Sequence, residues 1–262
     1  MLSLQTKQMN NRFEILNSYF DKIFVLYLPR LSDRVSALQK NLAGLDYELF
    51  EGIDKNKITI DEMRSTGLYS KELFQELYPG IDNMHPGMLC CALGHVNIYK
   101  RIIEKGYNKT LILEDDVVVD DNSLKQFPAI ITELPTDWEM FYLGYEKNEQ
   151  FGLREKFKQL AHYIFPPYSK LKIRRRYIKH FYPATLSPHI ARAGFHDCTH
   201  AYAVTLNGAR KLLAHQLPVR FNPDNLLSHL ICMGKINGYI ARPKLFNQLS
   251  AFSNKIDSLT SA

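Results

Sequence analysis

Apolar residues recur along this chain at two spacings, which predict strands and helices in alternation. Runs at 22–28, 111–119 and 139–143 are almost continuously apolar, as is typical of strands buried on both faces of a sheet. Residues 87–105 instead carry apolar side chains three or four positions apart, which indicates a helix, and Gly106 follows in the position favoured after a helix end. Strands separated by helices predict a parallel sheet.

Other segments extend this alternation. Residues 55–86 contain several helix breakers, so we expect short helices or a loop there. The remaining expected elements are a helix capped by Ser32 or Asp33, strands at 47–50 and 201–206, helices at 207–216 and from Pro223, and a last element at 239–248. The fold class predicted is α/β, with a mixed, mostly parallel sheet flanked by helices.

Three adjacent carboxylates, Glu114, Asp115 and Asp116, interrupt the apolar run that we interpret as one strand at 111–119. Like charges a few ångström apart in a buried site repel one another and lose hydration, so burial without a partner is unfavourable. A divalent cation would neutralise them, and open α/β sheets bind ligands at the carboxyl ends of their strands. We therefore expect a cation there.

Composition places an unusual segment in the second half. The chain has 33 Lys and Arg against 27 Asp and Glu, a net charge of +6. Residues 147–179 alone hold ten bases and two acids, interleaved with aromatic residues, so the rest is slightly acidic. We interpret 145–195, with Arg174-Arg175-Arg176 at its centre, as a basic aromatic insert in a single domain of residues 1–262. Such a run is usually a solvated face, but its density favours contact with an anionic membrane or a phosphorylated glycolipid.

The cysteines and the N-terminus bear on the compartment. Of the four cysteines, Cys90 and Cys91 are adjacent, the other two are isolated, and no CxxC pair occurs, so neither a zinc knuckle nor a secreted disulfide framework is indicated. Residues 1–11 lack the features of a signal peptide, and no apolar run approaches the length of a membrane span. We expect a cytoplasmic protein, with peripheral contact to the inner membrane as a further hypothesis.

Four stretches of the sequence carry a resemblance to a known family. They are Val25–Leu28 with Arg30 and Arg34; Gly87 followed by Cys91–His95; Leu113–Val117; and Ala201–Thr205 with Ala209–Leu213, Pro223-Asp224, Pro243 and Gln248. In this order and spacing they resemble glycosyltransferase family 25, the bacterial lipooligosaccharide glycosyltransferases related to the collagen galactosyltransferases. Gly94 departs from the usual Ser, and Cys90 stands where a second Gly is common.

This resemblance implies a specific chemistry. It implies a GT-A-like, Rossmann-type fold, a UDP-hexose donor that is often UDP-galactose, a Mn²⁺ or Mg²⁺ ion, and inversion at the anomeric carbon. The acceptor implied is a lipooligosaccharide, a lipopolysaccharide (LPS) or another surface glycan, and no nucleic acid partner is expected.

Because side chains alternate between the two faces of a strand, the three carboxylates should point to two different sides. Glu114 and Asp116 should face the metal together, while Asp115 points to the other side and reaches ribose or sugar hydroxyls, unless a turn after Leu113 alters this division. An exposed acidic turn between two strands is the alternative. Arg30 and Arg34 follow the first strand at the same edge and suit a diphosphate or uracil, although pairing with surface acids is the alternative.

Two further residues complete the expected site. His95 is either a donor-site residue, as the resemblance implies, or a hydrogen-bonded core histidine. Asp224 is the expected catalytic base, because inverting transfer needs a carboxylate to take the acceptor's proton; Asp197 is the second candidate, and helix capping is the alternative role for Asp224. A histidine from residues 196–200 is a weaker candidate for the metal.

Two other functions compete with the transferase. A metal-dependent phosphoesterase would use the same carboxylates to activate water, but it usually needs a second metal site. A non-catalytic module that binds nucleic acid or an anionic glycan would rest on the basic insert alone, and it leaves the carboxylates unexplained.

Overall fold

The computed structural model describes residues 11–149, 152–165, 172 and 175–249. Residues 1–10, which we expected not to be a signal peptide, lie outside this range, as does Arg174 in the basic insert. Among the described residues, no helix is both long and apolar enough to span a membrane.

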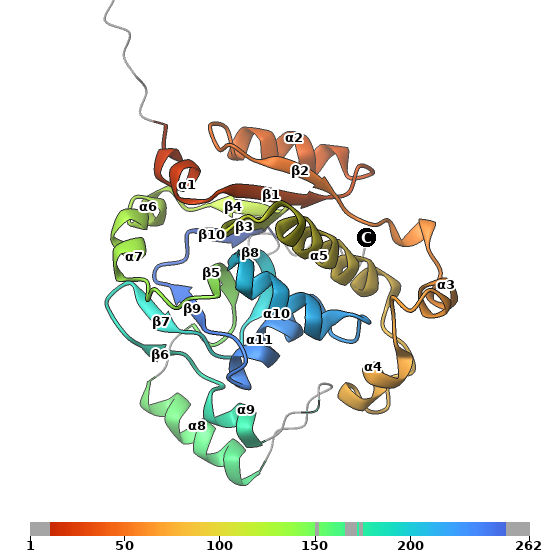
Figure 1. Ribbon diagram of the computed structural model, residues 1–262. Coiled ribbons are helices and arrows are strands. Elements are labelled where there is room, and N and C mark those ends of the chain that lie inside the picture. The colour runs from red at the N-terminus through yellow and green to blue at the C-terminus, as the bar shows by residue number, and fades with distance from the viewer. Residues whose placement is uncertain (1–10, 150–151, 166–171, 173–174, 250–262) are drawn as a thin grey trace, which may run out of the picture.

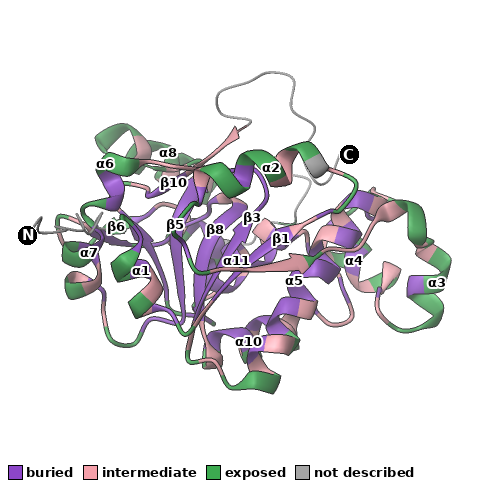
Figure 2. Cartoon of the chain, turned by 90° about the horizontal axis from the view of Figure 1, so that it is seen from above, coloured by how far each residue is buried: buried purple, intermediate pink, exposed green. Residues whose placement is uncertain are grey.

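A central sheet of eight strands forms the core of the molecule (Figures 1 and 2). Its order is β2-β1-β3-β8-β5-β9-β7-β6, and a separate small sheet pairs β10 with β4. The strands are β1 (Lys22–Tyr27), β2 (Glu48–Glu51), β3 (Lys109–Glu114), β4 (Val117–Val119), β5 (Met140–Glu146), β6 (Ala184–Thr185), β7 (Ile190–Arg192), β8 (Asp197–Thr205), β9 (Gly238–Ala241) and β10 (Phe246–Gln248).

Strand direction brings several strand ends to one edge. The strands β2, β1, β3, β5, β9 and β6 all run the same way, whereas β8 and β7 run against them. The first residues of β8 therefore lie at the edge where β3 ends. The predicted α/β class with a mixed, mostly parallel sheet is confirmed, and the sites described below lie at this edge.

Helices cover both faces of the sheet. Alternate strand residues point into two apolar clusters, with Phe24 and Ile112 in one and Val25 and Leu113 in the other. The helices are α1 (Glu14–Tyr19), α2 (Ser32–Asn41), α3 (Ile60–Ser65), α4 (Lys71–Leu77), α5 (Pro86–Lys105), α6 (Asp121–Leu124), α7 (Phe127–Glu133), α8 (Leu153–Ile164), α9 (Arg175–Lys179), α10 (Leu206–Gln216) and α11 (Pro223–Cys232), with a 3₁₀ turn at Lys55–Lys57.

The long helix α5 forms as its sequence predicts. Pro86 occupies the first turn, where its missing N–H is not needed, and Gly106 ends the helix in the left-handed conformation with φ 71°. Gly94 lies in its middle, where a Cβ atom would stand 3.2 Å from the Leu26 side chain of β1. Its lack of a side chain lets α5 lie close to the sheet, which matters because α5 carries His95.

Three sequence predictions need correction. Residues 111–119 are two strands, because the chain turns at Asp115 and Asp116 and continues as β4 in the other sheet. Residues 239–248 are likewise two strands separated by Arg242-Pro243, where proline offers no backbone donor to a ladder. The N-cap of α2 is Leu31, with no side-chain cap, and not Ser32 or Asp33.

The predicted insert is partly integrated into the main sheet. The strand predicted at 139–143 continues to Glu146, and β6 and β7 extend the sheet at its far end. Gly144 is required where it stands, because a Cβ there would clash with the His200 ring and the Phe246 carbonyl of β10. The helix α8 lies at the margin of the molecule beside α9 (Figure 1).

Candidate functional site: buried carboxylates at the sheet edge

The three carboxylates lie at the carboxyl end of β3 and are almost completely buried. Glu114 is the last residue of the strand, and Asp115 and Asp116 form the turn that follows it. Their exposed fractions are 6%, 2% and 1%. Because a buried carboxylate is stable only with donors or a cation beside it, the partners of each oxygen decide what this site can bind.

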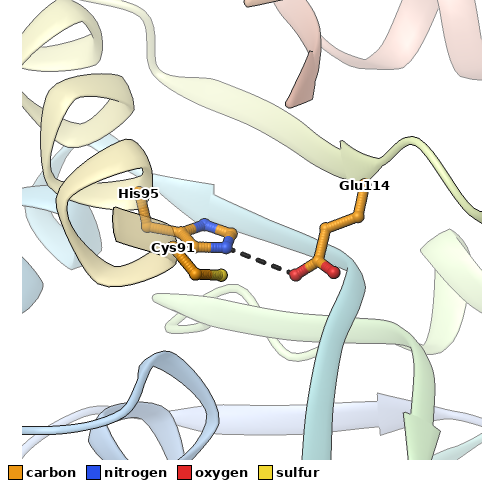
Figure 3. Close-up of side chains that lie close together, drawn as sticks. All are labelled: Cys91, His95 and Glu114. Atoms are coloured by element: carbon orange, nitrogen blue, oxygen red, sulfur yellow. Dashed lines mark hydrogen bonds and ion pairs between the residues drawn. The ribbon is translucent and has the colours of Figure 1, made fainter. Parts of the chain in front are cut away.

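Glu114 is held by donors from two other elements. Its Oε1 atom lies 3.3 Å from His95 Nε2 of α5 (Figure 3) and accepts a 2.5 Å hydrogen bond from Thr199 Oγ1 of β8. Burial alone would raise the pKa of Glu114, but the hydrogen bond and charge of His95, with the bond from Thr199, lower it below its ordinary value. Glu114 is therefore ionised at neutral pH.

A chain of buried hydroxyl groups supports His95 from behind. Tyr202 Oη lies 2.8 Å from His95 Nδ1, and Tyr99 Oη lies 2.8 Å from Tyr202 Oη. Since ionised Glu114 can only accept, His95 Nε2 donates to it. The Tyr202 hydroxyl lies between His95 Nδ1 and the Tyr99 hydroxyl and is hydrogen-bonded to both. These bonds hold the imidazole ring against Glu114, so His95 acts as a positioning residue.

Asp115 and Asp116 each have one oxygen with a partner and one without. Asp115 Oδ1 lies 3.3 Å from Arg34 of α2, and Asp116 Oδ2 accepts a 2.8 Å bond from Gln248 Nε2 of β10. Within the described part of the chain, the buried atoms Asp115 Oδ2 and Asp116 Oδ1 have no hydrogen-bond partner. Burial is the main cause that raises the pKa of Asp115 to about 6 and of Asp116 to about 7, and the charge of Glu114 adds to it.

These two oxygens fit a divalent cation. Mn²⁺ and Mg²⁺ prefer carboxylate oxygens, and an ion between adjacent carboxylates removes both the repulsion and the lost hydration. The geometry offers free oxygens on Asp115 and Asp116, whereas the expected pair was Glu114 and Asp116. The strand ends at Glu114, so the alternation of side chains between the two faces of a strand does not turn Asp115 away from Glu114 and Asp116.

A second group of potential ligands lies directly beside this site. One ligand atom each of Cys91, His95 and Glu114 lies within 4.8 Å of the others (Figure 3). Burial raises the pKa of the Cys91 thiol well above its ordinary value, which keeps the thiol protonated. Both nitrogens of His95 are already engaged in hydrogen bonds. The group is therefore better suited to fixing Glu114 than to binding a metal.

The two arginines predicted for the site, Arg34 and Arg30, have different partners in the structure. Arg34 lies in the first turn of α2, is 13% exposed at its side chain and faces Asp115. Arg30 is more exposed and lies 3.4 Å from Asp54. Arg34 is thus part of the carboxylate site, while Arg30 lies beside it with a partner of its own.

Asp224 lies in a cavity of about 420 Å³ that is also lined by Asp197 and by the aromatic residues Phe74, Tyr78 and Phe195. It is the second residue of α11, and the N-cap position belongs to Asn222, so the alternative role of Asp224 as a helix cap is wrong. Burial, followed by the charge of Asp197, raises the pKa of Asp224 to about 6. A carboxylate with this pKa can accept a proton at neutral pH.

The start of β8 connects the cavity to the carboxylates. Thr199 bonds to Glu114, and the backbone of Cys198 bonds to Asp224. Asp197 forms an ion pair with Lys147, which leaves Asp224 as the better base of the two. Cys198 has φ 71°, so this segment is not simply extended.

His196 and His200, the two histidines of residues 196–200, contact backbone atoms of neighbouring segments. His196 accepts from the Gly194 amide at Nε2, and its Nδ1 lies 2.9 Å from the Lys147 carbonyl oxygen; burial lowers its pKa to about 4. His200 Nε2 lies 3.4 Å from the Phe246 carbonyl oxygen. Sequence reasoning assigned no role at the site to Thr199, Tyr202 and Gln248, because only the fold brings them to it. Tyr202 and Gln248 do lie in the stretches that carry the family resemblance.

A larger and more open cavity, of about 550 Å³, lies beside β10. Its lining is strongly charged, but Lys244 is already paired with Glu146 and Glu149. Of the two cavities, the one with Asp224 combines a partly buried carboxylate with aromatic surfaces.

Comparison with known proteins finds one family and several of its members. Residues 20–227 match the model of the family described as Glycosyltransferase family 25 (LPS biosynthesis protein). The Bos taurus protein named "Probable inactive glycosyltransferase 25 family member 3" is 25% identical over 208 residues, which are 77% of this chain and 30% of that protein. Procollagen galactosyltransferase 2 of Mus musculus is 21% identical over 74% of this chain and 27% of that protein.

Another relative is procollagen galactosyltransferase 1 of Danio rerio, which is 23% identical over 80% of this chain and 33% of that protein. This chain therefore spans about a third of the length of the curated relatives it matches.

The unpartnered oxygens predict how Asp116→Asn changes stability. The folded-state pKa of Asp116, about 7, lies above its ordinary value of 3.8, so its contribution to stability is present below pH 4 and is lost as the pH rises through 7. At pH 8 with chelator, Asp116→Asn should raise the free energy of unfolding by about 1–3 kcal/mol. Urea denaturation measures this, and at pH 4 the difference should vanish.

The same variant should lose its response to metal. Mn²⁺ should raise the Tm of the wild type but not that of Asp116→Asn. Glu76→Gln, which removes an exposed carboxylate of α4, is the matched control and should respond like the wild type. Equal stabilisation of Asp116→Asn by Mn²⁺ would contradict the assignment of the ion to this residue.

The hydroxyl chain predicts unequal costs for two similar substitutions. Tyr202→Phe leaves both His95 Nδ1 and the Tyr99 hydroxyl without a partner, so it should destabilise the protein by about 2–3 kcal/mol. Tyr99→Phe removes only the outermost hydroxyl and should cost about 1 kcal/mol. Urea denaturation of both variants checks this order, and equal costs would argue against the central position of Tyr202 in the chain.

Proposed function

Since this chain belongs to glycosyltransferase family 25, we propose that it is a metal-dependent, inverting glycosyltransferase that moves galactose from UDP-galactose to a lipooligosaccharide, LPS or other surface-glycan acceptor. The observation that carries this proposal is a pair of buried carboxylate oxygens, Asp115 Oδ2 and Asp116 Oδ1, that have no hydrogen-bond partner among the residues the structure describes. Family membership favours the transferase over a phosphoesterase that would use the same carboxylates.

The choice of donor and acceptor rests on the relatives. Two of them are named procollagen galactosyltransferases, which supports galactose as the transferred sugar. The family description refers to LPS biosynthesis, which supports a surface glycan as the acceptor. Because other relatives are named as inactive, the activity of this chain has to be measured directly.

The carboxylate site would hold the donor through its diphosphate. Asp115 and Asp116 would hold Mn²⁺ or Mg²⁺, and the ion when bound would stabilise the negative charge that develops on the leaving diphosphate. Arg34 beside Asp115 adds a fixed positive charge at the same edge of the sheet. Glu114 would keep the site in position, because its oxygen is already engaged by His95 and Thr199.

The cavity of Asp224 would take the acceptor sugar. Phe74 and Tyr78 are stacked, with ring centroids 4.7 Å apart, and they line the cavity together with Phe195. Such rings suit the apolar faces of a sugar. Asp224 would accept the proton of the attacking hydroxyl as the new bond to the anomeric carbon forms, and this attack from the face opposite the diphosphate inverts the configuration.

Two substitutions should separate binding from transfer. Asp224→Asn should lower kcat by at least about 100-fold and leave the Mn²⁺-dependent stabilisation by UDP intact, because only the base is lost. Asp116→Asn should abolish both. The assay is product formation and thermal shift over a panel of nucleotide sugars and acceptors, with Glu76→Gln as the control.

Two outcomes of this assay would count against the proposal. Failure of every nucleotide sugar to stabilise the protein in the presence of Mn²⁺ would overturn it. Stabilisation by a UDP-sugar without turnover on any acceptor would instead favour a non-catalytic binding protein.

The pKa of Asp224 predicts the acid limb of the pH profile. Only the ionised carboxylate accepts a proton, so kcat/KM should rise with pH and level off above about 6. Below this value it should fall about tenfold per pH unit. Measurement at saturating Mn²⁺ keeps the metal site loaded, and a profile flat from pH 5 to 8 would argue against Asp224 as the base.

A further inference from the structure

The helix α8 exposes an apolar stripe to solvent. Of the large apolar residues that are exposed in the described chain, most belong to α8 or follow it directly. Because a helix turns by about 100° per residue, its four stripe positions fall within an arc of about 60°. The α8 stripe consists of Leu153, Phe157, Leu160 and Ile164, exposed by 74%, 72%, 59% and 55%.

The opposite side of α8 is polar, and this side faces the rest of the protein. Glu155, Gln159 and His162 are its less exposed residues. Gln159 Nε2 donates to the carbonyl oxygens of Ile178 and Lys179 in α9, at 2.6 and 3.2 Å. Helices of water-soluble domains usually do the reverse and turn their apolar face to the core. The amphipathic character of α8 is thus directed outward.

Basic residues lie on both flanks of the α8 stripe. Arg154 lies about 100° from Leu153 on one side, and Lys156 lies about 60° from it on the other. Lys158 lies beyond Arg154. The segment 147–179 holds ten bases and two acids, whereas the rest of the chain is slightly acidic. An apolar stripe between flanking bases is typical of helices that lie in the plane of a membrane surface.

We propose that α8 docks this protein on the surface of an anionic lipid bilayer, with the α8 stripe in the acyl boundary and the flanking bases at the headgroups. Charge decides between this occupant and a second copy of the chain. Two copies joined through this stripe would bring like-charged flanks together, whereas anionic lipid neutralises them. The proposal does not depend on the transferase activity.

The position of α8 links this surface to the acceptor cavity. α8 packs against α9, and α9 packs against α11, the helix that begins at Pro223 and carries Asp224. Docking through α8 would therefore hold the cavity near the bilayer, where an acceptor attached to lipid would be found.

Vesicle flotation of the full chain tests the proposal. The wild type should float with vesicles of phosphatidylcholine and phosphatidylglycerol, and weakly or not at all with phosphatidylcholine alone. The double variant Phe157→Ser/Leu160→Ser should bind at least about tenfold more weakly, because two exposed apolar anchors are lost. Its Tm should equal that of the wild type, since neither side chain is buried.

Two further variants serve as controls. Leu186→Ser removes a side chain that is also 55% exposed but lies outside α8, and it should float like the wild type. Arg154→Gln/Lys158→Gln should weaken binding at low ionic strength and have little effect at high ionic strength, where the charges are screened.

Three results would overturn the proposal. The first is an absence of flotation with the anionic vesicles, and the second is flotation that Phe157→Ser/Leu160→Ser leaves unchanged. The third is a dimer, measured by light scattering, that is lost in this variant while vesicles are not bound; the α8 stripe would then be an interface between copies.

Discussion

The burial of three consecutive carboxylates at the end of β3 is the constraint on which the arrangement of this protein depends. Each carboxylate is stabilised by a different element: Glu114 by α5 and β8, Asp115 by α2, and Asp116 by β10. These elements come from the two ends and the middle of the sequence. Burying charge in this way is expected to lower the stability of the fold in favour of function. The cost is largest at Asp115 Oδ2 and Asp116 Oδ1, which have no hydrogen-bond partner in the described part of the chain.

The parts of the fold that depend on local pattern could be predicted from the sequence. The helix α5 has a clear apolar period and a glycine after its last residue, so its bounds were predicted almost to the residue. The reason to expect a cation at Glu114–Asp116 was also visible in the sequence. The orientation of the three side chains was not, because strand alternation does not apply where the chain turns after Glu114. The contacts of Thr199 with Glu114 and of Gln248 with Asp116 could not be predicted, because they join residues far apart in the sequence.

The basic insert shows a different limit of sequence reasoning. Its charge was recognised, but the spacing of Leu153, Phe157, Leu160 and Ile164 was not used, and this spacing ordinarily indicates a face turned to the core. Only the structure shows that the polar side of α8 is the one facing the protein. Part of the insert also became sheet, since β6 and β7 pair beyond β9. The direction in which an amphipathic helix faces depends on the neighbours it meets.

Gly144 has no side chain that could bind or react, yet the space around it limits which substitutions this site can accept. It has no functional group, yet the His200 ring and the Phe246 carbonyl occupy the space where its side chain would be. Phe246 begins β10, the strand that brings Gln248 to Asp116. A larger residue at 144 would displace that strand and withdraw the amide from the carboxylate. Divergence at this position therefore requires compensating change in β10, so the two segments should vary together among relatives even though neither holds a reacting group.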